Sequence, residues 1–139
     1  MTQLIVTPAF ESDLDALDEG TDADRDAVDA AEVLIEELAG NLSVLADLFS
    51  PGLRADHDPL FEVKRFEEVW KTGYNILIFK YWDLFGALAD YRIFVGYHAL
   101  KDTYYALAIT HRSIAYDNSS ENFNTLLVRY QSCDIPVWR

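Results

Sequence analysis

Three runs of β-branched and aromatic residues in the second half of this chain restrict its fold more than any other feature. They are YNILIFKYW at residues 74–82, YRIFVGYH at residues 91–98 and TYYALAIT at residues 103–110. Such runs are typical of strands, and the short link at residues 100–102 predicts a hairpin between the last two. The resulting sheet has an apolar face, so the rest of the chain must supply its cover.

The first half of the chain carries the signals of helices. Residues 3–6 are a short apolar run that predicts a first strand. Thr7 and Pro8 then have the form of an N-cap and a first helical turn, and Thr21 has the form of a second cap. Gly40 is a natural end for that second helix. Apolar spacing also predicts a helical piece near residues 42–49 and a final helix at about residues 120–130, whereas residues 61–70 fit neither period.

This order of elements predicts an α+β fold. We expect an N-terminal strand and helices packed on one face of a small antiparallel sheet, with a short C-terminal helical extension. The 139 residues suit a single domain, with a helical, acidic part at about 8–50, a strand meander at about 72–112, and a C-terminal helix and tail at 119–139. No apolar run reaches the roughly 18 residues of a membrane span, so we expect no membrane contact. The lone Cys133 forms no intrachain disulfide, which fits the cytoplasm.

The charge of the chain is strongly asymmetric. Residues 1–63 contain sixteen Asp and Glu against two Arg, a net charge of −14, whereas residues 64–139 carry nine Lys and Arg against eight acids, a net charge of +1. Proteins that grip nucleic acid over a broad surface are normally basic, so any such contact is expected locally, in the C-terminal half. Three interpretations of the acidic stretch stay open: a solvated helix face, adaptation to a salt-rich cytoplasm, and a docking surface for a basic partner.

Two arginines near the predicted hairpin are candidates for an anion site. Strand alternation places Arg92 on one face together with Phe94, Gly96 and His98. Alternation in the next strand predicts a shared face for Tyr104, Ala106, Ala108, Thr110 and Arg112, with Tyr105, Leu107 and Ile109 as core against the helices. The small residues indicate a roomy face on which two guanidinium groups could hold a phosphate. The alternative is that both arginines are structural cations paired with carboxylates.

The pieces DYRIFVGYH, TYYALAIT and HRSIAY, in this order after a strand and two helices, resemble the RelE/ParE superfamily of bacterial toxins from toxin–antitoxin pairs. The likeness in element order covers most of residues 3–117, and at the level of residues it is confined to about 74–117. RelE-like members cleave mRNA on the ribosome, whereas ParE-like members inhibit DNA gyrase and are not nucleases. The resemblance therefore implies a cognate antitoxin as partner, and either the ribosome with mRNA or DNA gyrase as target.

The resemblance also implies roles for individual residues. In the RelE-type reaction the ribose 2′-hydroxyl attacks the adjacent phosphate, which requires proton transfer and neutralisation of charge. Arg92 and Arg112 match the arginines that would neutralise the phosphate, and Tyr116 matches the tyrosine that would orient a base. His111 is the candidate for proton transfer, if the strand end turns it inward. Lys80 and His98 are candidates for substrate binding. The alternatives are structural roles: His111 as a hydrogen-bonded residue at a strand end, and Tyr116 as an anchor at the edge of the core.

The chain also departs from the RelE pattern. It is longer and acidic where RelE-like toxins are small and basic, and Asn75, Ile76 and Leu77 stand where those toxins carry lysines. Three hypotheses remain: a ribosome-dependent endoribonuclease, a ParE-like non-catalytic toxin, and an inactive interaction protein on the same fold. The sequence contains no phosphate-binding loop, dinucleotide fingerprint or zinc-ligand spacing, so we expect neither a cofactor nor a metal.

Overall fold

The computed structural model describes residues 3–40, 61–81, 90–111 and 121–137. In chain order the elements are β1 (Gln3–Val6), α1 (Pro8–Asp18), α2 (Asp22–Gly40), β2 (Phe61–Arg65), α5 (Glu67–Trp70), β3 (Ile76–Tyr81), β4 (Tyr91–His98), a 3₁₀ turn (Ala99–Lys101), β5 (Thr103–His111) and α7 (Glu121–Ser132). The helical piece predicted at residues 42–49 lies outside the described residues. The ambiguous segment at residues 61–70 divides into a strand and a short helix.

The α+β prediction is confirmed. Five strands form one sheet in the order β1-β5-β4-β3-β2. The meander β2 to β5 is antiparallel, and β1 pairs with β5 in parallel, with Gln3 opposite Thr103. The chain therefore leaves the sheet after β1 and returns to it only after both helices. Among the described residues, β1 and β2 are the two edges of the sheet.

The first two helices begin where the sequence predicts. The Thr7 hydroxyl accepts a hydrogen bond from the Phe10 N–H at 3.1 Å, and Pro8 occupies the first turn of α1. At α2, Thr21 and Asp24 bond reciprocally, since the Thr21 Oγ1 accepts from the Asp24 N–H and Asp24 Oδ2 accepts from the Thr21 N–H, both at 3.1 Å. Such a capping box satisfies two donors that would otherwise lack partners at a helix start.

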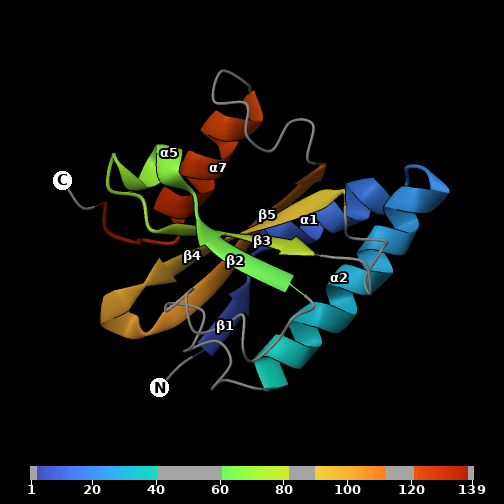
Figure 1. Cartoon of the computed structure of the whole chain (residues 1–139), viewed down its shortest axis with the longest axis horizontal. Coiled ribbons are helices and arrows are strands. Elements are labelled where there is room, and N and C mark those ends of the chain that lie inside the picture. Colours follow the sequence, from blue (N-terminus) through green and yellow to red (C-terminus); the bar gives the residue numbers. More distant parts are fainter. Residues whose placement is uncertain (1–2, 41–60, 82–89, 112–120, 138–139) are drawn as a thin grey trace.

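Helices cover both faces of the sheet (Figure 1). On the first face, α1 and α2 pack Phe10, Ala31 and Leu34 against strand residues such as Phe79 and Ile93. On the second face, α5 with the residue before it, α7, and the segment after α7 supply the apolar residues Phe66, Val69, Leu126, Tyr130 and Ile135. We call these the α1–α2 face and the α7 face. The C-terminal helix is therefore the cover of the second face.

The predicted assignment of β5 side chains to faces is wrong, because a β-bulge interrupts the pairing of β4 and β5. Phe94 pairs with Ala108, but the next residue, Val95, pairs with Ala106, which leaves Leu107 as an extra residue. An extra residue reverses the alternation of all that follow. Tyr104 and Ala106 consequently pack on the α1–α2 face, whereas Ala108 packs on the α7 face.

The predicted roomy face is also filled. A Cβ atom built on Gly96 would stand 2.9 Å from Ile135 Cδ1, 3.1 Å from Leu107 Cδ1 and 3.2 Å from Tyr130 Cδ2. The small residue at position 96 therefore serves the close approach of α7 and the segment that follows it. It does not open a surface for a ligand.

An ion pair between α1 and α7 completes the edge of β5 beyond the end of β1. Arg129 donates to both carboxylate oxygens of Asp13, at 2.6 and 2.9 Å, and its Nη1 also donates to the Leu107 carbonyl at 2.9 Å. Asp13 Oδ2 in turn accepts from the Ile109 N–H at 3.1 Å. Two side chains thus provide hydrogen bonds that a neighbouring strand would otherwise make.

Candidate functional site: a buried arginine and an acidic groove

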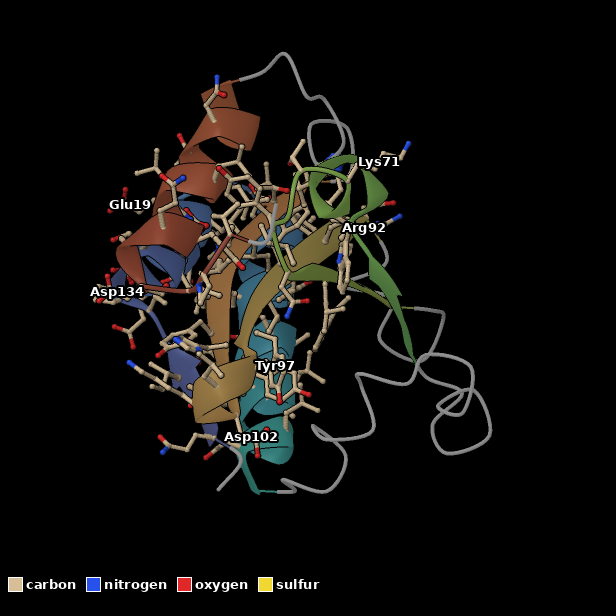
Figure 2. All side chains as sticks on the ribbon, turned by 90° about the vertical axis from the view of Figure 1, so that its left-hand side faces the viewer. Glu19, Lys71, Arg92, Tyr97, Asp102 and Asp134 are labelled. Atoms are coloured by element: carbon tan, nitrogen blue, oxygen red, sulfur yellow. The ribbon has the colours of Figure 1, made fainter. Side chains whose placement is uncertain are left out.

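Arg92 lies inside the protein. It is 5% exposed and stands in β4 beside Phe94, whose ring packs on the α7 face. One of its guanidinium nitrogens, Nη1, donates to the Tyr91 carbonyl at 2.9 Å. Its register partners are Lys80 on β3 and Thr110 on β5, so the three residues form one row across the strands. Figure 2 shows Arg92 at the end of the sheet near α5, close to Lys71 in that view.

His111 belongs to the opposite face. It pairs with Tyr91 in register, and the two rings meet edge-on, with centroids 5.4 Å apart. Tyr91 is part of the core under α1 and α2, and His111 itself is exposed. The strand end therefore does not turn His111 toward Arg92. The structure does not bring these two candidates together as groups on a single phosphate.

The surroundings of His111 are acidic. A cavity of about 320 Å³ is lined by Tyr91, His111 and residues of α2 and its neighbourhood, namely Thr21, Ala23, Asp24, Asp26 and Asp90. The Tyr91 hydroxyl donates a hydrogen bond to Asp24. Burial, followed by this bond, raises the pKa of Tyr91 to about 12, while the same bond lowers the pKa of the Asp24 carboxyl. Carboxylates of this kind attract cations and repel phosphate.

The second histidine candidate, His98, lies at the far end of β4. It is 5% exposed, and its Nδ1 atom has no hydrogen-bond partner among the described residues. It stands six positions after Arg92 along the extended strand, a distance of about 20 Å. Tyr97 and Asp102 mark that end of the sheet in Figure 2, well away from Arg92. His98 and Arg92 therefore cannot bind the same small group.

Three predicted site residues remain. Arg112 and Tyr116 lie outside the described residues, and for Lys80 the structure gives the backbone pairing alone. Among the described residues, no three His, Cys, Asp or Glu side chains gather in a way that could hold a metal ion. In the same part of the chain, no helix combines the length and apolar character needed to cross a bilayer.

Sequence reasoning missed a groove between α1 and α2, with a volume of about 450 Å³. Its floor is apolar and consists of Val6, Phe10, Leu14, Ile35 and Ala39. Its rim is acidic and consists of Glu11, Asp15, Glu32 and Glu36, all four exposed. We call it the α1–α2 groove. The acidic stretch carried the signal, because helical spacing places these carboxylates beside the apolar stripes of both helices.

The ion pair of Asp13 and Arg129 was also missed. Asp13 stands three residues after Phe10, so it lies on the buried side of α1 rather than on its solvated side. Both side chains are about four-fifths buried, at 19% and 20% exposure. A carboxylate within the apolar stripe of a helix was the available sign that a buried partner exists.

Comparison with protein-family models, with curated proteins and with solved structures finds no match to this chain.

Proposed function

We propose that this chain is a RelE/ParE-like protein that acts by binding another protein and not by cleaving RNA. The element order on which the resemblance rests supports the family assignment: a strand, two helices, and a meander whose last strand pairs in parallel with the first. The separation of Arg92 and His111 on opposite faces of the sheet supports binding over catalysis. A general acid or base has to lie within hydrogen-bond reach of the group it serves.

Charge supports the same choice. The ribosome presents a dense array of phosphates, and a protein that approaches it is favoured by surface cations. This chain has a formal net charge of −13, and neither α1 nor α2 carries a basic residue in its last turn. A protein target such as DNA gyrase, which the ParE resemblance implies, or an antitoxin makes no such demand for a basic surface.

One observation favours the endoribonuclease as a second candidate. Lys80 and Arg92 are direct register partners, and Thr110, whose hydroxyl oxygen has no partner among the described residues, continues the row. Two cationic residues and a hydroxyl at adjacent strand positions could serve a phosphate together with Arg112 and Tyr116. The RelE-type reaction therefore requires a direct test.

Cell-free translation with the purified protein, followed by primer extension on the mRNA, separates the two candidates. Protein binding predicts intact message, and a parallel supercoiling assay with DNA gyrase reports whether the target is the one that the ParE resemblance implies. Cleavage confined to ribosome-bound message, abolished by Arg112→Ala in a variant with an unchanged circular dichroism spectrum, would refute the binding proposal. The exposed Lys101→Ala is the matched control for the loss of a positive charge.

A further inference from the structure

The α1–α2 groove combines two properties that are unfavourable in a protein without a partner. Its floor is apolar, with Val6, Leu14 and Ile35 partly exposed over the buried Phe10, and its volume of about 450 Å³ falls in the range of sites that hold ligands. Its rim places four carboxylates around this apolar floor, with no Lys or Arg among the described residues that line it. Like charges close together repel, and none of these lining residues carries a positive side chain.

The C-terminal end of α2 adds to the negative potential. The groove runs to Ala39, one residue before the C-terminus of α2, where the helix dipole is negative. Glu36 lies in this last part of the helix, and no basic residue stands in the last turn of either α1 or α2. A cation beside Glu36 would therefore interact favourably with the carboxylate and with the dipole.

We propose that the α1–α2 groove binds a basic amphipathic helix of a partner protein. Aliphatic side chains of that helix would pack on the partly exposed Val6, Leu14 and Ile35, and flanking Lys or Arg would pair with the rim. The lining stretch of α2, residues 32–39, is about 10 Å long, which matches two turns of a docked helix. This inference rests on the proposed function as a protein binder and specifies the partner's chemistry.

Charge also argues against two other occupants. A second copy of this chain, docked through the same groove about a two-fold axis, would bring rim carboxylates against rim carboxylates. The chain's own apolar residues at 42–49 include Asp47 and no Lys or Arg. Neither would neutralise the rim, whereas a basic helix neutralises it and covers the floor at once.

The test is a binding titration of the full chain with a labelled synthetic helical peptide of about 15 residues, carrying Leu on one face and Lys on the other. A peptide with Glu in place of every Lys is the control probe. We expect saturable binding of the Lys peptide that weakens as salt rises, and no binding of the Glu peptide. The variant Glu32→Lys/Glu36→Lys, which changes exposed residues, should weaken binding by about tenfold or more.

Two further variants locate the site. Ala39→Arg places a long cation at the exposed end of the groove and should also abolish binding. Asp18→Lys/Asp29→Lys makes the same change in charge as the first double variant, but on exposed positions of α1 and α2 that do not line the groove. This variant should retain most of the peptide binding. Equal losses in the two double variants, or no binding of the Lys peptide to the unaltered chain, would overturn the groove as the site.

Sedimentation of the free chain completes the test. A dimer that Ala39→Arg dissociates would assign the groove to a second copy and overturn the proposal. Failure of peptide binding with intact inhibition of supercoiling would remove the groove alone and leave the proposed function. Peptide binding together with cleaved message would retain the groove and remove the proposed function.

Discussion

The two faces of the sheet are built by different means. Helices α1 and α2 cover the α1–α2 face, and each carries its N-terminal cap and its apolar stripe within one continuous segment. The core beneath them contains hydrophobic side chains from Phe10 to Ile109. The α7 face buries the hydroxyl of Tyr130, and Arg92 is buried in β4 two residues before Phe94 of that face. Burial of apolar area stabilises both faces, and hydrogen bonds between distant segments add to it. On the first face the bond from Tyr91 to Asp24 is only partly buried, whereas on the second the bond from the Asn75 N–H to Tyr130 is buried.

The Tyr130 hydroxyl illustrates the second kind of face. It accepts a hydrogen bond from the Asn75 N–H at 3.0 Å and donates to the Pro136 carbonyl at 2.8 Å. Its ring meets Tyr74 edge-on, with centroids 5.2 Å apart. One side chain thereby joins the start of β3, helix α7 and the segment after α7, so the position of α7 depends on a few polar contacts.

The largest effect is expected from truncation of the apolar core. Phe10→Ala removes a fully buried ring from the α1–α2 face and should lower the free energy of unfolding by about 3–5 kcal/mol, measured by urea denaturation. Val33→Ala, at a side chain that is 49% exposed on α2, is the control and should change it by no more than about 0.5 kcal/mol. Similar losses in both variants would contradict the placement of the core.

The ion pair that links the two faces comes second. Asp13→Ala leaves the Ile109 N–H without its acceptor and Arg129 without its carboxylate partner, and should lower the free energy of unfolding by about 2–4 kcal/mol. Asp15→Ala, two residues further along α1 and exposed, is the matched control, with an expected change within about 0.5 kcal/mol. If Asp13→Ala were as mild as its control, the pair would not hold α7 to α1.

A smaller loss is expected at Tyr130. Tyr130→Phe keeps the ring but leaves the Asn75 N–H without an acceptor, at an expected cost of about 1–2 kcal/mol. Hydrogen exchange should show the effect in α7 before α2, because the lost bonds belong to the α7 face alone. Faster exchange in both helices to the same extent would mean that the two faces do not open separately.

The smallest effect on the free energy of unfolding is expected from the ionisation of two tyrosines at alkaline pH. Burial, followed by hydrogen bonding to a carboxylate, raises the pKa of both Tyr91 and Tyr97 to about 12. Since each folded-state pKa lies above the unfolded value of about 10, this stabilisation is complete below pH 10 and is lost as pH rises toward 12. We expect Tyr91→Phe to be less sensitive to pH in this window than the unaltered chain, measured by urea denaturation at each pH. If the free energy of unfolding fell equally steeply with pH in the variant and in the unaltered chain, the ionisation of Tyr91 would not be linked to unfolding.

The candidate site also shows which features the sequence predicted and which it did not. Sequence analysis identified Arg92, His98 and His111 as polar residues of a strand hairpin, and it predicted that Phe94 and Gly96 share a face of β4, which their contacts on the α7 face confirm. It could not show that α7 covers that face, because no local pattern states which face of a sheet a later helix will reach. The sequence showed the acidic residues of the α1–α2 groove but not its concave shape, because that shape depends on how α1 packs against α2.

The sequence by itself determined the first strand, the starts of α1 and α2, and the hairpin of β4 and β5. Thr7, Thr21 and the apolar spacing act within a few residues, so their effect can be evaluated without knowledge of the remainder of the chain. Only the tertiary structure decided the face of each residue after Leu107 and the pairing of Asp13 with Arg129, which lie 116 residues apart. The physical reason is that a bulge and the exposed edge of a strand are set by hydrogen bonds to distant segments, which become partners only when the chain folds.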